Sequence, residues 1–309
     1  MDHAALVALF QRVVLASAPL LAGSGCEDHC NTPEREVTKP VVSETDAAAP
    51  DAGVADLCRE ALPPNPDGYY IKKCELVAAD GGQAVHVVFA LKCTGGRRPE
   101  GLTSPALATR RDPLGAWLAG CAHLEAASID AFEILASELA AHRGPRPLIA
   151  AARAAGRDER RHAAVVGRLA ARRGHRTPPA RVARTATRDI ETIARENAVE
   201  GCVRETYAAL VACRQARAAA DPAIRAAMAG IARDETRHAA LAWAVDAWAA
   251  GRLSRPARHR VREARQQAST TLLAEQAAPL SSSLRALAGL PDADEVSQMV
   301  AMLRAGLPS

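Results

Sequence analysis

The chain is poor in several features that carry function in other proteins. Of its 309 residues only nine are aromatic, and the net charge is just +4. The basic residues are interleaved with acidic ones and do not gather with aromatics, so binding to nucleic acid is not indicated. No glycine-rich phosphate loop and no Gly-x-Ser-x-Gly motif occurs, which removes support for nucleotide-binding and serine-hydrolase functions.

Long hydrophobic runs are also missing. The one apolar stretch near the start, residues 13–22, follows Arg12 and is too short to span a membrane. Small residues come after it, so residues 1–25 are predicted to be a signal peptide. The segment before Cys26 loosely resembles a bacterial lipoprotein cleavage box, with Cys26 as a possible lipid anchor. We therefore expect an exported protein, periplasmic or held at the membrane as a lipoprotein.

The cysteines are concentrated near the N-terminus. Five of the eight precede residue 100: Cys26, Cys30, Cys58, Cys74 and Cys93. A segment this short builds a weak core, and in an oxidising compartment disulfides would stabilise it. Zinc is the competing interpretation, but a second close cysteine pair is missing, so disulfides are favoured. The sequence leaves the pairing open.

Between the signal and the helices, two segments differ in character. Residues 26–65, rich in Pro, Ala and acidic residues, are predicted to be a disordered linker. Residues 66–100 carry the strand signals, with β-branched and aromatic runs on both sides of Asp-Gly-Gly at 80–82. We expect a small disulfide-stapled β element there, joined to the rest by residues 95–100.

The remainder is predicted to be helical. Asp112-Pro113 and Asp221-Pro222 are typical helix starts, and breaks are expected near 143–145, 177–179 and 251. Residues 114–250 thus contain four helical segments, and 255–305 form a C-terminal helical extension. The predicted fold class is all-α: a four-helix bundle with extra C-terminal helices and a small Cys-rich N-terminal β element.

The most informative motif is a repeat. Residues 158–162 read Asp-Glu-Arg-Arg-His, and residues 234–238 read Asp-Glu-Thr-Arg-His. In each copy a glutamate and a histidine stand three positions apart, so both can reach one ion from a single helix face. Glu125 lies 34 residues before Glu159, and Glu200 lies 35 residues before Glu235. The repeat suggests a duplicated helical hairpin that carries a two-metal site.

This arrangement resembles the ferritin-like di-iron carboxylate superfamily, in which two helices each give a glutamate and two others each give Glu-x-x-His. The resemblance covers roughly residues 114–250. It implies two metal ions, iron first and manganese second, and an outer shell beneath the histidines. It also implies a tyrosine near the metals at Tyr207, whereas Phe132 stands at the matching position of the first hairpin. The implied ligands are Glu125, Glu159, His162, Glu200, Glu235 and His238, and the implied outer shell is Asp158, Arg161, Asp234 and Arg237.

Three functions follow from the resemblance. The first is an oxidoreductase that uses O2 or peroxide on an unknown small substrate, with Tyr207 as a catalytic candidate. The second is a ferroxidase that handles iron, and the third is a non-catalytic surface protein with an interaction role. Two further acids, Asp130 and Glu205, lie five residues past presumed ligands, about 140° round an α-helix. We expect them to face solvent or a neighbouring helix. The oligomeric state is left open.

Overall fold

The computed structural model describes residues 35–40, 57–58, 61, 69–79, 82–91, 96–102, 112–183, 186–275 and 280–306. The predicted signal peptide, the candidate anchor Cys26 and most of the predicted linker lie outside these residues, as do Cys30 and Cys93. Within the described part, no helix combines the length and the apolar character that a membrane span requires.

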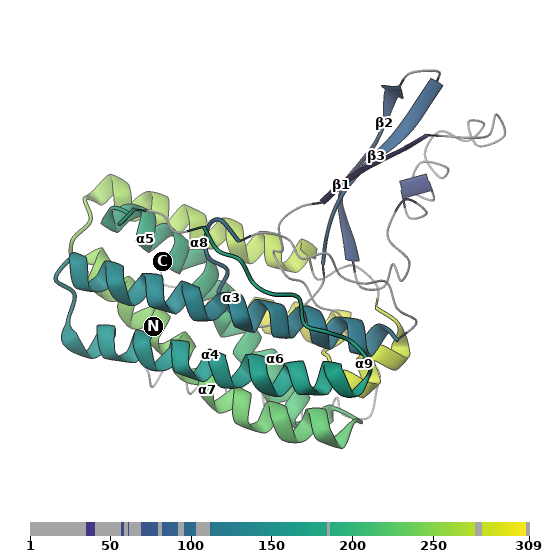
Figure 1. Ribbon diagram of the computed structural model, residues 1–309. Coiled ribbons are helices and arrows are strands. Elements are labelled where there is room, and N and C mark those ends of the chain that lie inside the picture. The colour runs from purple at the N-terminus through teal and green to yellow at the C-terminus, as the bar shows by residue number, and fades with distance from the viewer. Residues whose placement is uncertain are drawn as a thin grey trace.

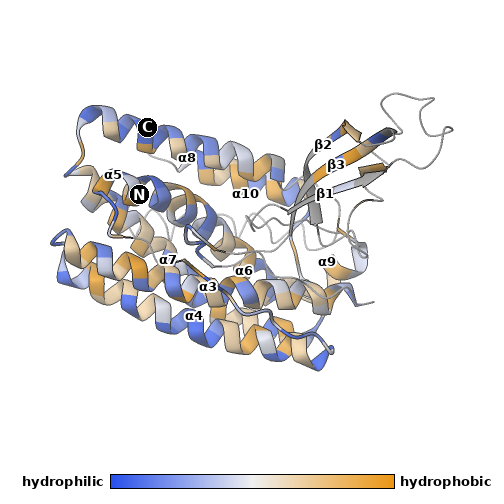
Figure 2. Cartoon of the chain, turned by 45° about the horizontal axis from the view of Figure 1, so that its top comes forward, coloured by the Kyte–Doolittle hydropathy of each residue, from blue (hydrophilic) through white to orange (hydrophobic). Residues whose placement is uncertain are grey.

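The protein is mostly helical, and its main helices lie side by side in a bundle (Figure 1). α3 packs along α4, α6 along α7, and α4 along α7, so the two predicted hairpins are in contact. In Figure 2 polar and apolar residues alternate along α4 and α8, as amphipathic helices require. The helices of this part are α3 (Pro113–Ala141), α4 (Arg146–Arg172), α5 (Ile190–Glu196), η3 (Asn197–Glu205), α6 (Thr206–Ala218) and α7 (Pro222–Ala250).

Two aspartates begin helices as predicted. The Asp112 carboxylate accepts a hydrogen bond from the Leu114 backbone N–H, and the Asp221 carboxylate accepts from Ala223 and Ile224. Proline follows each aspartate at the first helical position, where a missing N–H costs nothing. These caps fix where α3 and α7 start, and so set the register in which their ligand residues face inward.

The third segment of the bundle contains a wide turn that the sequence analysis did not predict. Residues 190–218 are continuously helical, but Asn197–Glu205 form the π-helix η3. A π-helix closes hydrogen bonds five residues apart instead of four, and such turns are frequent at functional sites. The wide turn changes which side chains of this segment share a face.

The C-terminal extension completes the core. Leu272 of α8 (Arg255–Glu275), Leu284 of α9 (Ser282–Ala288) and Val300 of α10 (Ala293–Ala305) belong to the same buried cluster as the bundle residues Leu118 and Trp243. α8 and α10 match the predicted extension. α9 is a new element: it is only seven residues long, with a Ser281 cap and Gly289 in the left-handed conformation at its end.

A three-stranded antiparallel sheet, in the order β1-β3-β2, precedes the helices. β2 (Tyr69–Ala79) and β3 (Gly82–Leu91) pair as the predicted hairpin, with Ala79 opposite Gly82. β1 (Arg35–Pro40) corrects the linker prediction, because these residues pair along β3. β1 is an edge strand of mixed charge that ends in proline, a composition that protects edges but hides the strand from sequence analysis.

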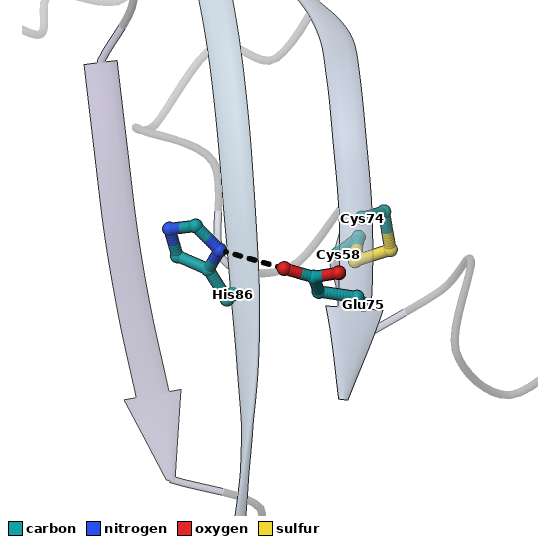
Figure 3. Close-up of a disulfide and its surroundings, with 4 residues drawn as sticks. All are labelled: Cys58, Cys74, Glu75 and His86. Atoms are coloured by element: carbon teal, nitrogen blue, oxygen red, sulfur yellow. Dashed lines mark hydrogen bonds and ion pairs between the residues drawn. A yellow bond between two sulfur atoms is a disulfide. The ribbon is translucent and has the colours of Figure 1, made fainter. Parts of the chain in front are cut away.

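A disulfide joins Cys74 of β2 to Cys58, which lies between β1 and β2 in the chain (Figure 3). Cys58 is fully buried against Val85 and Val87 in a small core of its own. On the next strand His86 lies 3.4 Å from the Glu75 carboxylate. The disulfide agrees with the prediction of a stapled β element and is consistent with an oxidising, exported location.

Replacing Cys58 by serine should destabilise the sheet while leaving the helices folded. The bond closes 16 residues, and a loop of that length is worth about 3 kcal/mol of unfolded-state entropy. Limited proteolysis should then release the sheet region faster. Cys213→Ser, which changes a free and half-buried cysteine of α6, is the matched control. Equal protease sensitivity of the two variants would contradict the prediction.

Candidate metal centre

The two Glu-x-x-His pairs lie on facing helices in the middle of the bundle. α4 carries Glu159 and His162, and α7 carries Glu235 and His238. All four are buried, none more than 3% exposed. The spacing of three places each pair on the inward face of its helix, as the sequence predicted.

Around His162 four residues form a compact group. Ligand atoms of Glu125, Glu159, His162 and Glu235 all lie within 4.8 Å of one another. The His162 Nδ1 atom is 3.5 Å from a Glu125 oxygen, 3.5 Å from a Glu159 oxygen and 3.3 Å from a Glu235 oxygen. This buried group could hold a metal ion.

His238 stands on the other side of the same two carboxylates. Its Nδ1 atom lies 3.1 Å from Glu159 Oε1 and 3.7 Å from Glu235 Oε1, and the two imidazole rings are 5.9 Å apart. Glu159 and Glu235 therefore sit between the two histidines and contact both. The geometry gives two carboxylates that could bridge two ions.

The polar atoms at the centre have no other partners. Neither oxygen of Glu159 or of Glu235 has a hydrogen-bond partner, and the same holds for the Nδ1 atoms of both histidines. Unsatisfied buried polar atoms are rare and costly. Their separations of 3.1–3.7 Å are close to the roughly 3 Å between neighbouring ligands on an octahedral ion with bonds of about 2.1 Å. The residues fit a metal ion.

Each of the two aspartates contacts the histidine of the opposite helix, an arrangement that we call crossed. Asp234 of α7 lies 3.0 Å from the Nε2 atom of His162, and Asp158 of α4 lies 3.4 Å from the Nε2 atom of His238. Arg161 and Arg237 each donate hydrogen bonds to both aspartates. A carboxylate on the second ring nitrogen fixes the tautomer and orientation of a ligating histidine. The sequence predicted these four residues but not the crossing.

The pKa values show how strongly the groups are coupled. Burial alone would lower the pKa of His162 and His238, but the surrounding carboxylates outweigh it and raise both pKa values. Burial and the neighbouring Glu159 charge raise the pKa of Glu125 well above its usual range. Burial works against ionised Asp158, yet His238 and Arg161 bring its pKa below the ordinary value. Without metal, the centre therefore retains protons.

Glu200 is not part of this group. Its carboxylate is buried in η3 but lies 3.6 Å from Arg98 and 3.5 Å from Arg204. The predicted ligand thus faces two arginines instead of the histidines. The spacing argument treated the segment as a regular α-helix, and η3 is not one.

Glu205, expected to face solvent or a neighbouring helix, is 1% exposed, and its charge interacts with those of His238, Glu235 and Glu159. Burial raises its pKa to about 8, against the lowering effect of Arg97. The i→i+5 bonding of η3 brings residues five apart close to one face, whereas an α-helix separates them. A nine-residue π-helix leaves no periodic signal in the sequence, so the full burial of Glu205 could not be predicted.

A second missed feature is a strap, residues 96–102, that enters the bundle beside the centre. Residues 96–99, expected to be a plain connection, are buried. The Arg97 backbone N–H donates to Ser128 Oγ, and its guanidinium donates to Asn197 Oδ1 at 2.6 Å. Gly201 makes room for it, because a Cβ there would stand 2.5 Å from the Arg97 Nη2 atom.

The two aromatic positions of the repeat have different surroundings. Phe132 packs against the His238 ring with 5.0 Å between centroids, and the Arg97 guanidinium lies over the Phe132 ring, 5.5 Å from its centroid. Tyr207 is buried in α6 within the core cluster that includes Leu118 and Trp243. Its catalytic role stays a prediction.

Comparison of the chain with protein-family models, with curated proteins and with solved structures found no match.

Proposed function

We propose that this protein is an exported, ferritin-like helical protein that binds two metal ions, iron in preference to manganese, and reacts with O2 or peroxide. One observation carries the proposal. Glu159 and Glu235 lie between two buried histidines, and none of the inward-facing atoms of these four residues has a hydrogen-bond partner. Leaving such charges uncompensated would cost several kcal/mol, and bound cations remove that cost.

The donor set supports iron or manganese. It consists of carboxylates and two imidazoles, without a thiolate, and hard oxygen donors with imidazole suit these ions. When bound, two such ions supply electrons to O2 or peroxide. The chain's own residues supply the rest. Glu159 and Glu235 contact both histidines, the crossed aspartates orient the imidazole rings, and burial of the centre keeps water out.

Metal analysis of the purified protein tests the proposal. The wild type, loaded with Fe²⁺ without oxygen, should hold about two ions per chain, the number expected for a two-metal site. Glu159→Gln removes the charge of a carboxylate that touches both histidines and should lose most of the metal. Glu133→Gln on α3, an exposed glutamate that pairs with the exposed Arg160, is the control. Circular dichroism verifies the fold of each variant.

The same samples separate the candidate functions. Consumption of O2 by the loaded wild type, and its absence in Glu159→Gln, is the expected result. Metal bound in wild type without O2 or peroxide consumption would favour the non-catalytic, interaction alternative. Equal metal content in wild type and Glu159→Gln would overturn the proposed centre.

A further inference from the structure

We propose that Glu205 is a further metal-binding residue, on the His238 side of the centre, and that Arg97 positions it. The inference rests on the proposed function and assigns to this site a carboxylate that lies outside the repeated motif. In this role Glu205 takes the place of Glu200, the ligand that the repeat predicts.

The first argument is an asymmetry between the two histidines. On the His162 side, Glu125 contributes an oxygen 3.5 Å from the ring nitrogen. On the His238 side, the corresponding glutamate is Glu200, whose carboxylate lies 3.6 Å from Arg98 and 3.5 Å from Arg204. Glu159 and Glu235 each contact both histidines, so they leave the His238 Nδ1 atom without a further carboxylate beside it. The His238 side therefore lacks the additional oxygen donor that Glu125 gives to the His162 side.

Glu205 has the properties of the missing donor. Its side chain is 1% exposed, and neither carboxylate oxygen has a hydrogen-bond partner. It lies within electrostatic range of His238, Glu235 and Glu159. A fully buried carboxylate without a hydrogen bond is costly, and the residues that sense its charge are those of the metal centre.

The backbone explains why a residue five positions after Glu200 can serve. In an α-helix the two would be about 140° apart. In η3 the i→i+5 bonds bring the two residues close to one face. Both carboxylates are therefore buried, but their neighbours differ: Arg98 and Arg204 lie beside Glu200, and Arg97 lies beside Glu205.

Arg97 holds Glu205 in place. Its Nε atom lies 3.8 Å from a Glu205 oxygen, and the guanidinium is itself fixed by Asn197 and by the Phe132 ring. Phe132 in turn packs on His238. This chain of contacts connects the Glu205 carboxylate to the histidine that it would assist.

Titration with Co²⁺, a visible probe of metal binding, tests the inference. The metal-free wild type, Glu205→Gln and Glu200→Gln are compared by absorption and by equilibrium dialysis. We expect wild type and Glu200→Gln to bind two ions alike. In Glu205→Gln, the second ion should bind more than about tenfold more weakly, since even supporting residues are worth that much. A loss in Glu200→Gln with none in Glu205→Gln would overturn the inference.

Two further measurements distinguish a failure of this inference from a failure of the proposed function or of a variant to fold. If the wild type binds no Co²⁺, the proposed function itself fails. If Glu205→Gln does not fold, Glu205→Ala takes its place, and added acetate should restore the second Co²⁺ by filling the space of the carboxylate. Acetate that restores nothing in a folded Glu205→Ala protein would also count against Glu205 as a ligand. Arg97→Lys should weaken the second ion less than Glu205→Gln does.

Discussion

Removing metal with a chelator should lower the free energy of unfolding by about 4 kcal/mol for each bound ion, when free metal is supplied at roughly a thousand times its dissociation constant. The metal-free centre buries Glu125, Glu159 and Glu235 beside two histidines. Thermal unfolding with and without chelator measures the difference. Unchanged melting temperatures would show that these residues bind no metal in the folded protein.

The size of this effect should depend on pH. Carboxylates raise the folded pKa of His162 and His238 above the ordinary value of about 6.5. Their protonation therefore stabilises the metal-free protein fully below about pH 6.5, and this contribution is lost as pH rises towards the folded pKa values. Metal binds neutral imidazole, so the gap between metal-bound and metal-free protein should widen from pH 6 to pH 9.

At low pH the stability of the protein should change in the opposite direction, because it should fall as the pH falls. The pKa of Asp158 is held below its ordinary value, against the effect of burial, by His238 and Arg161. Its contribution is present above about pH 4 and is lost as pH falls through the folded pKa. A metal-free protein that gained stability from pH 6 to pH 9 would contradict this account of the histidines.

The second large effect should come from the crossed aspartates. Asp158→Asn and Asp234→Asn should each lower metal affinity about 10- to 100-fold, because each removes the carboxylate that orients a histidine. The crossing predicts which ring responds. Asp158→Asn should shift the imidazole signals of His238 on α7, and Asp234→Asn those of His162 on α4, in NMR spectra of the metal-free protein.

Asp294→Asn, an exposed aspartate at the start of α10, is the matched control and should leave metal affinity unchanged. If each aspartate variant disturbed the histidine of its own helix instead, the crossed arrangement would be wrong. The aspartates would then support their own helices and not the opposite ring.

Much of the helical part could be predicted because its boundaries depend on local chemistry. Asp112-Pro113 and Asp221-Pro222 cap helices through their own side chains. The histidines and the glutamates beside them were also predictable, since the spacing of three fixes their common face. These signals act over a few residues, so a single sequence contains them.

What could not be predicted depends on distant contacts or on irregular backbone. The π-helix η3 has no periodic signature, so neither the arginine contacts of Glu200 nor the burial of Glu205 could be predicted. The crossing of the aspartates depends on how α4 faces α7. β1 is a strand because β3 pairs with it, not because its own residues favour strands.

The strap has a consequence for the electroneutrality of the bundle. Two carboxylates of η3, Glu200 and Glu205, lie beside the guanidinium groups of Arg98 and Arg97, which precede α3 in the chain. A fragment cut at Asp112 would keep both buried carboxyl groups but lose these two arginines, with a hole left beside Gly201. The smallest self-sufficient helical piece of this protein therefore begins near Gly96.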